Sequence, residues 1–570
     1  MRSVLRSTST RVLLTALVLV VAAAPLFANA TINIININAP GVGFNDSTPK
    51  APIGGNPGTT LGEQRMIAFQ YAAAIWATML DSAVPINVEA RMIQLACTPT
   101  AGTLSSTGAL GFWANFPGAP QANTWYHVAL ANRLAFADLA PGSAGDPNAD
   151  DMITNFNSSI GTNPSCLTGL DWYYGLDDNH GVNFDLVTVL LHEFSHGLGF
   201  APTINKTTGA LLGPPSYPDT YTRFLFDNPL GLGFAAMTDA QRVAATKDTL
   251  HVVWTGANVT AKVPTTLQLG APVLTVNSPA SVAGVYAVGT AQFGPALASP
   301  GVTGNLVLVN DGVAPATDAC QPLVNAAAVA GNVALLDRGT CTFVVKTKIA
   351  QNAGAIAVVV ADNAPGSPPA GLAGVDPTIV IPTVRISLAD GNAIKAALGS
   401  GVNVTVGLNP TLRAGADPAG RALIYTPVPV AGGSSLSHWD VSATPNLLME
   451  PAINSDLTHN VDLTLPLMRD IGWAPDADLD GVVDGSDQCL HSDLRTTVVV
   501  GACDSGVGNT LFANGCTIAD QVKGCAAGAG NHGAFVSCVA HLTDGLKGAG
   551  VISGAQKGSI QSCAAGASIP

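Results

Sequence analysis

The segment HEFSHGLG at residues 192–199 contains the residue types of a metal-binding helix. His192 and His196 are four residues apart, so on a helix their imidazoles project from the same side and can reach one tetrahedral Zn²⁺. Glu193 lies between them and can act as a general base that takes a proton from water during attack on a peptide carbonyl. The pattern predicts a hydrolytic zinc site; the alternative is a helix whose two histidines are only hydrogen-bonded.

Two histidines do not complete such a site, because a catalytic zinc generally takes three protein ligands and one water. Pro202 occupies the position where a nearby third histidine would follow the glycine. Ser437-His438-Trp439-Asp440 supplies a distant candidate, His438. His180 and His459 are the rival third ligands.

A helix must carry the motif, and the apolar residues from 183 to 200 recur at spacings of three or four, as on one buried helical face. Before it, Thr31–Asn38 alternates as a strand does, and Thr60 and Glu63 form a capping box for a helix over 61–80. The segments 85–95, 125–130 and 152–156 are strand-like. Strands and helices therefore interleave in an α/β arrangement.

The motifs together resemble the leishmanolysin-type metzincins, in which an inserted domain separates the two-histidine helix from the third ligand. The matching segments are HEFSHGLGF, SHWD, LLMEP and LTLPLMRDIGW. The resemblance implies a metzincin-like α/β (α+β) catalytic domain of a zinc metalloendopeptidase acting on proteins or peptides. It makes His192, His196 and His438 the zinc ligands, Glu193 the general base and Met449 the apolar floor under the metal.

The same resemblance places His180 and His459 outside the ligand set, because neither fits the order of the family's motifs. By analogy, residues 150–159 would be the edge strand along which an extended peptide substrate pairs through main-chain hydrogen bonds.

An insertion is predicted between Pro202 and about Ser437, where the composition changes to Gly, Ala, Val, Pro and Thr. Within it, NVALLDRGTCTFVVKTKIAQNAGAIAVVVADN and IPTVRIS resemble a protease-associated (PA) domain. That resemblance implies a β-rich, mixed α/β domain, a disulfide between Cys320 and Cys341, and a role in substrate access or protein interaction. A small domain with no binding role is the alternative.

Residues 476–489, DADLDGVVDGSDQC, form an aspartate ladder. Calcium takes six to eight oxygen ligands, and alternating aspartates around a tight-turn glycine supply them from one short loop. The segment resembles a thrombospondin type 3 repeat; a solvated acidic linker is the alternative. The predicted calcium ligands are Asp476, Asp478, Asp480, Asp484 and Asp487.

The first 30 residues have the order of a secretory signal: three arginines, an apolar run over 12–24, and Ala28-Asn29-Ala30 as a cleavage site. The apolar run is shorter than the roughly 20 residues that a membrane-spanning helix needs. We expect cleavage near Ala30, secretion, and no transmembrane anchor in the mature chain.

The ten cysteines are grouped in even numbers, which predicts disulfides within domains, as in exported proteins. The groups are Cys97 with Cys166, Cys320 with Cys341, and six cysteines from Cys489 to Cys563. The pairing within the C-terminal group stays open.

The predicted organisation divides the 570 residues into seven segments. They are a signal peptide over 1–30, the N-terminal part of the catalytic domain with the zinc helix over 31–202, a cleft-flanking segment over 203–305, the PA domain over 306–408, the C-terminal part of the catalytic domain over 409–475, the aspartate repeat over 476–489, and a disulfide-containing tail over 490–570.

Composition narrows the function classes. With 47% hydrophobic and 11% charged residues the chain is core-forming, and a net charge of -14 without a basic cluster argues against nucleic acid as a partner.

The second functional hypothesis, beside the zinc metalloendopeptidase, is a secreted calcium-dependent binding or adhesion protein with a degenerate protease domain. Glu193 separates the two, because a binding protein does not need a base between two zinc ligands. A zinc hydrolase of a non-peptide bond is the third.

Overall fold

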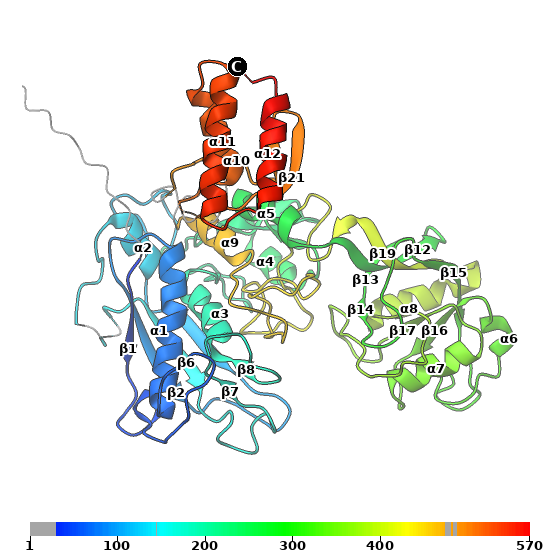
Figure 1. The fold of residues 1–570 in the computed structure, drawn as a ribbon. Coiled ribbons are helices and arrows are strands. Elements are labelled where there is room, and N and C mark those ends of the chain that lie inside the picture. Colours follow the sequence, from blue (N-terminus) through cyan, green and yellow to red (C-terminus); the bar gives the residue numbers. More distant parts are fainter. Residues whose placement is uncertain are drawn as a thin grey trace, which may run out of the picture.

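The computed structural model describes residues 30–143, 145–146, 148–473, 480, 482, 487–512 and 514–569. The predicted signal peptide up to residue 29, and Asp476, Asp478 and Asp484 of the aspartate ladder, lie outside the described residues. Figure 1 shows three bodies: a large one that contains the zinc-motif helix, a second one drawn in green and yellow beside it, and the C-terminal helices. Each body has its own hydrophobic packing: the large body and the C-terminal body have one core each, and the second body has two.

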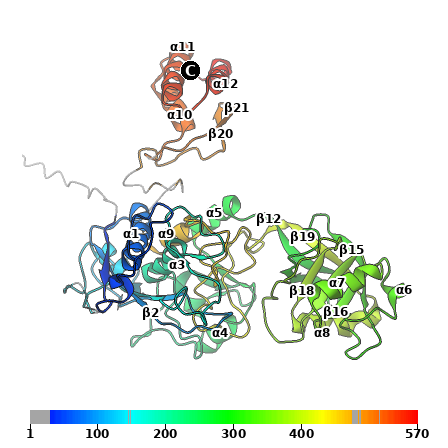
Figure 2. The same ribbon diagram turned by 60° about the horizontal axis from the view of Figure 1, so that its bottom comes forward.

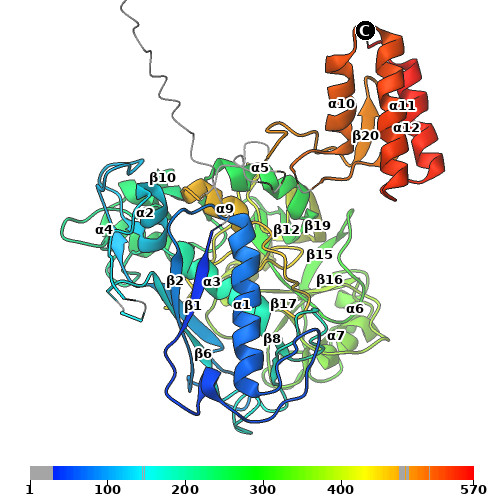
Figure 3. The ribbon, with the colours of Figure 1, turned by 60° about the vertical axis from the view of Figure 1, so that its left-hand side comes forward.

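A four-stranded sheet forms the framework of the large body. Its strands lie in the order β1 (Ile32–Asn36), β2 (Ile86–Ile93), β6 (Met152–Asn157) and β3 (Ser105–Ala109). The first three are parallel, and β3 runs antiparallel to β6 at the edge. Two helices, α1 (Leu61–Met79) and α3 (Leu186–Leu198), contact each other, and α3 also contacts β3 and β6 (Figure 3).

Helix α1 begins where the capping box predicts. The Thr60 side chain accepts from the Glu63 backbone N–H, and the Glu63 carboxylate accepts from Thr60 N. The buried face of α1 then packs on the zinc-motif helix: the Trp76 indole donates to Leu191 O at 3.2 Å, and Phe69 contacts the Phe194 ring. The predicted helix over 61–80 is confirmed.

The remaining elements of the large body surround α3. They are β4 (Phe112–Trp113), β5 (Tyr126–His127), α2 (Val128–Ala135), β7 (Trp172–Tyr173), β8 (Phe184–Asp185), β9 (Leu225–Asp227), β10 (Leu232–Gly233), α4 (Asp239–Ala245), β11 (Val252–Trp254), α5 (Ala257–Thr266), α9 (Thr464–Ile471) and the short 3-10 turns Gly43–Asn45, Thr222–Phe224 and Phe234–Ala236. The strand expected over 125–130 was wrong: β5 contains only Tyr126–His127, and α2 begins at Val128.

The second body is one eight-stranded sheet, in the order β13-β12-β19-β15-β16-β17-β18-β14. Its elements are β12 (Leu269–Ser278), β13 (Gly284–Ala287), β14 (Gly289–Thr290), β15 (Val302–Leu308), α6 (Ala326–Val329), β16 (Val333–Asp337), α7 (Phe343–Asn352), β17 (Ala357–Ala361), β18 (Thr383–Ile386), α8 (Leu388–Ala397), a 3-10 turn (Leu398–Ser400) and β19 (Asn403–Arg413).

Strands β15 to β18 of this sheet are parallel. Helix α8 packs into one of its two hydrophobic cores, whereas α6 and α7 pack into the other. Every residue of β17 is buried, as expected of a parallel strand covered on both faces. The segment 203–305 divides between the two bodies: its first part, up to Leu267, joins the core of the large body, and Leu269 starts the second sheet.

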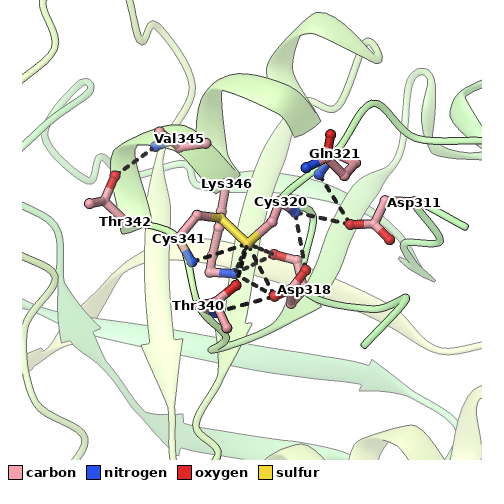
Figure 4. The surroundings of a disulfide bond; sticks show 9 residues. All are labelled: Asp311, Asp318, Cys320, Gln321, Thr340, Cys341, Thr342, Val345 and Lys346. Carbon is pink, nitrogen blue, oxygen red and sulfur yellow. Dashed lines mark hydrogen bonds and ion pairs between the residues drawn. A yellow bond between two sulfur atoms is a disulfide. The ribbon is translucent and has the colours of Figure 1, made fainter. Parts of the chain in front are cut away.

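The disulfide between Cys320 and Cys341 joins the segment before α6 to the start of α7 (Figure 4). The fully buried ammonium of Lys346 donates to Asp318 O and lies 3.1 Å from Cys320 Sγ. Its ion pair with the buried Asp318 carboxylate, at 3.5 Å, compensates the charge. This cluster fixes the N-terminal end of α7 against the sheet.

The C-terminal body contains β20 (Thr497–Val500), β21 (Cys503–Gly508), α10 (Ile518–Gly528), α11 (His532–Gly548) and α12 (Gly554–Gly566). It stands away from the other two bodies in Figure 2. Disulfides join Cys489 to Cys516, Cys503 to Cys563 and Cys525 to Cys538, and Cys97 to Cys166 in the large body. No cysteine is free.

Among the described helices, none combines the length and the apolar character needed to cross a bilayer.

Replacing Phe69 by Ala should lower the free energy of unfolding of the large body by about 3–5 kcal/mol, the usual cost of removing a buried phenylalanine. Phe69 is fully buried, with ring centroids 4.7 Å from Phe44 and 5.0 Å from Phe156. Urea unfolding followed by tryptophan fluorescence measures the change. Gln70→Ala, at the next, exposed position of α1, is the matched control; equal losses in both variants would contradict this packing.

Candidate metal centre

Helix α3 places His192 and His196 one turn apart in the interior of the large body. Asp185 caps the helix by accepting from Thr188 N at 2.7 Å. At the other end the helix stops at Gly199, whose φ of +127° is a conformation that residues with a side chain rarely adopt. Gly197 lets the helix approach β6, since a Cβ there would lie 2.4 Å from Met152 Sδ.

His438 reaches the same place from the segment that follows the second body. Tyr425 N donates to His438 O at 2.9 Å, and Trp439 N donates to Met449 O at 2.8 Å. The residues around His438 are therefore held on both sides by backbone hydrogen bonds, and His438 itself is only 5% exposed.

The three imidazoles converge. Their ring centroids are 5.0 Å apart for His192 and His196, 5.2 Å for His192 and His438, and 4.9 Å for His196 and His438. One ring nitrogen of each histidine lies within 4.8 Å of those of the other two. The fold thus brings His192 and His438 together although they are 246 residues apart in the sequence.

Backbone carbonyls determine which ring nitrogen carries the proton. Nδ1 of His192 lies 2.7 Å from Leu448 O, Nδ1 of His196 lies 2.9 Å from Phe200 O, and Nδ1 of His438 lies 2.9 Å from Ser434 O. A carbonyl oxygen only accepts hydrogen bonds, so each Nδ1 must be the donor. In the neutral rings each Nε2 then carries a lone pair.

Neutral rings are what burial favours here. Burial, and after it the neighbouring His192, lower the pKa of His196 to about 3. Burial also holds the pKa of His438 well below its usual value. Nε2 of His192 and Nε2 of His438 are 3.3 Å apart, and two lone pairs cannot hydrogen-bond to each other. Two donor atoms in a tetrahedral zinc site with bonds of 2.0–2.1 Å are about 3.3–3.4 Å apart. The donor set therefore fits Zn²⁺.

Glu193 follows the first of these histidines and is 6% exposed. Its Oε1 accepts from Ser105 Oγ, in the edge strand β3, at 2.6 Å. Its Oε2 is buried and has no hydrogen-bond partner. A buried carboxylate oxygen without a partner is costly, so this oxygen is suited to a water or a substrate group. Ser105 was not among the predicted site residues, because nothing in the sequence links it to a residue 88 positions away.

Met449 is fully buried, in the turn that holds the metal centre. Its neighbour Leu448 supplies the carbonyl for His192, and its own carbonyl accepts from Trp439 N. Asp462 supports this turn by accepting from Leu448 N, and Glu450 Oε1 accepts from Leu447 N at 2.9 Å. The turn therefore positions two of the three histidines at once, His192 directly and His438 through Trp439.

The rival histidines lie elsewhere. Nδ1 of His180 lies 2.9 Å from Asn183 O, and Nε2 of His459 lies beside Asp178 and Asp185.

Of the predicted calcium ligands, the described Asp480 and Asp487 both lie close to Gly515. A Cβ added at Gly515 would be 3.2 Å from Asp480 Oδ2 and 1.9 Å from Asp487 Oδ1.

The expected edge strand over 150–159 was wrong. These residues form β6, which is paired on both sides, with β2 and with β3. Strand β3 is the edge of the sheet, and it is the strand that carries Ser105. Both strands are short, and a sequence does not show which of two such strands is paired on both sides.

Comparisons with known proteins identify one part of the chain. Residues 302–394 match the family model of the PA domain. A PRADC1-like protein of Drosophila melanogaster is 48% identical over 50 residues, which are 9% of this chain and 26% of that protein. The chain therefore spans about a quarter of that relative. The expected PA domain is confirmed.

Two solved structures are similar over a minor part of their length. The zinc aminopeptidase BSAP from Bacillus subtilis is 23% identical, with a TM-score of 0.19 over 26% of this chain and 36% of that one. An aminopeptidase from Aneurinibacillus sp. strain AM-1 is 21% identical, with a TM-score of 0.19 over 27% and 37%. Similarity at this level carries no argument about the histidine site, which rests on its own geometry.

The leishmanolysin-type metzincin assignment is contradicted. The family model that matches is the PA domain, over residues 302–394. The fold is a mixed α/β protein with an inserted PA domain and a disulfide-rich C-terminal region. The physical reason for the error is that two histidines four apart and a distant third satisfy zinc on many frameworks, so these motifs specify metal chemistry and not a family.

Glu450 gives a pH test of the turn that holds the ligands. Burial raises the pKa of Glu450 to about 8 from an ordinary value of 4.5. The folded state therefore binds more protons than the unfolded state between these values, so stability from this group is present below pH 4.5 and is lost as the pH rises through 8. Glu450→Gln should remove that loss. The free energy of unfolding of the variant, relative to that of the native protein, should increase from pH 4.5 to 8 by at most about 1.4 kcal/mol per pH unit.

Thermal unfolding of the two proteins across this pH range measures the difference. Parallel stability profiles would show that Glu450 ionises freely in the folded state.

Proposed function

We propose that this chain is a secreted, zinc-dependent peptidase that cleaves within peptides. One observation carries the proposal: His192, His196 and His438 direct three Nε2 lone pairs to one point, beside a carboxylate with a buried oxygen that has no hydrogen-bond partner. A structural zinc site is usually closed by four protein ligands, whereas three ligands leave a position for water or substrate.

The chemistry follows from these groups. When bound, Zn²⁺ supplies Lewis acidity, which polarises a peptide carbonyl and lowers the pKa of water. Glu193 accepts the proton of the attacking water at Oε2 and delivers it to the leaving amine nitrogen. Ser105 donates to the other oxygen, Oε1, and so fixes the orientation of the carboxylate.

The edge strand β3 supports cleavage within a chain over removal of a terminal residue. An extended peptide can add to an exposed strand edge through main-chain hydrogen bonds, with little demand on its side chains. Ser105 lies in β3 and touches Glu193, so a peptide paired along this strand passes the base. No terminal charge is needed for such binding.

Export and calcium binding belong to the proposal as well. All ten cysteines are paired in disulfides, as is typical of proteins in oxidising compartments. The approach of Asp480 to Asp487 is compatible with a structural Ca²⁺ in the aspartate ladder. In the alternative, a calcium-dependent binding protein with a degenerate protease domain, the buried Glu193 would have no function.

Glu193→Gln should reduce peptide hydrolysis by about 10²–10⁴-fold while zinc content is retained, because the amide cannot accept the proton and no zinc ligand is changed. The substrate is an internally quenched peptide blocked at both ends, which an exopeptidase that needs a free terminus does not cleave. Glu89→Gln removes a buried carboxylate from β2, outside the site, and should keep activity.

Undiminished cleavage by the Glu193 variant would refute the role of the base. Cleavage of free-ended peptides only would refute endopeptidase action and leave the zinc chemistry standing.

A further inference from the structure

A second cluster of possible metal ligands lies at the other end of the zinc-motif helix. Asp178 comes from the loop between β7 and β8, Asp185 ends β8 and caps α3, and His459 comes from the segment before α9. One donor atom from each of these residues lies within 4.8 Å of those of the other two. The proposed peptidase chemistry does not use them.

One imidazole nitrogen faces two carboxylates. Nε2 of His459 is 2.9 Å from Asp178 Oδ1 and 3.2 Å from Asp185 Oδ1. A ring nitrogen carries one hydrogen at most, and it fits the Asp185 oxygen, whereas Asp178 Oδ1 has no hydrogen-bond partner. Hydrogen bonding therefore accounts for the contact of His459 with Asp185 but not for its contact with Asp178.

A buried carboxylate oxygen of Asp185 also has no hydrogen-bond partner. The Asp185 side chain is 2% exposed; its Oδ1 serves the helix cap at Thr188 N, and its Oδ2 has no hydrogen-bond partner. No Lys or Arg among the described residues forms an ion pair with either carboxylate. With a neutral His459 the cluster carries two negative charges, which one divalent cation would neutralise.

The distances also agree with ligation. Neighbouring ligands in an octahedral shell with bonds of about 2.1 Å are roughly 3.0 Å apart, close to both separations at Nε2. Two carboxylates with one imidazole suit a transition cation such as Mn²⁺ or Zn²⁺ better than Ca²⁺, which prefers oxygen ligands. Asp178, with its side chain 37% exposed, opens the cluster to solvent and gives a cation access.

We propose that Asp178, Asp185 and His459 bind a second divalent transition cation. Seven residues separate Asp185 from His192 along α3, or roughly 10 Å of helix. Paired catalytic metals are about 3.5–4 Å apart, so the second cation is structural. It ties the start of the zinc-motif helix to the segment that follows the turn at residues 446–450, and so holds together the two halves of the large body.

The test uses the full chain with its first site filled by zinc and with excess Ca²⁺ present to saturate oxygen-only sites. Mn²⁺ is then added, and bound Mn²⁺ is counted from the electron paramagnetic resonance of the free ion, alongside the melting temperature. The native protein should bind one Mn²⁺ more than Asp178→Asn and His459→Gln, and Mn²⁺ should raise the melting temperature of the native protein but not of these two variants.

Asp177→Asn is the matched control, because it removes the same charge from the neighbouring residue, which bonds to Tyr173 and not to His459. It should behave as the native protein does. Zn²⁺, the other candidate ion, is diamagnetic; for this ion, equilibrium dialysis followed by elemental analysis counts the bound metal in the same four proteins. If all four proteins bind equal amounts of both ions, the cluster is only an ion pair of a protonated His459, and the proposal is overturned. This result would not affect Glu193 or the three-histidine site.

Discussion

Three backbone carbonyls, those of Phe200, Ser434 and Leu448, determine which nitrogens the three histidines of the candidate metal centre offer to a cation. Each accepts the Nδ1 proton of one histidine, so each Nε2 is left with a lone pair. In the neutral rings, which burial favours for His196 and His438, the lone pairs of His192 and His438 face each other across 3.3 Å. A cation between them turns this repulsion into ligation. Metal binding should therefore be coupled to the docking of the segments that supply these carbonyls.

The inserted PA body does not disturb this arrangement, because the chain leaves and re-enters the large body at one place. Gln268 N donates to Thr444 O at 2.7 Å, Ala414 N donates to Gln268 O at 3.0 Å, and Arg413 donates to Leu267 O. The two connecting strands, β12 and β19, pair antiparallel over their length. Loop closure is thus completed within the insertion itself, and His438 returns beside α3 although more than 200 residues intervene.

The sequence predicted which histidines lie together, but only part of the structure that holds them. His192, His196 and Glu193 could be assigned because a helix converts a spacing of four into a shared face, and the cap at Thr60 follows from side-chain chemistry alone. Ser105 and the three carbonyls could not be found, because their contacts depend on tertiary packing and backbone atoms carry no residue signature. The edge position of β3 depends on pairing order, and the family assignment failed because short zinc motifs are shared by many frameworks.

The most direct test of the account is the zinc affinity of His438→Ala, measured by competition with a chromophoric chelator. Loss of one of three ligands should abolish the tight zinc site, whereas His180→Ala, which removes a histidine bonded only to the Asn183 carbonyl, should retain it. An unchanged zinc affinity in His438→Ala would contradict the three-histidine centre.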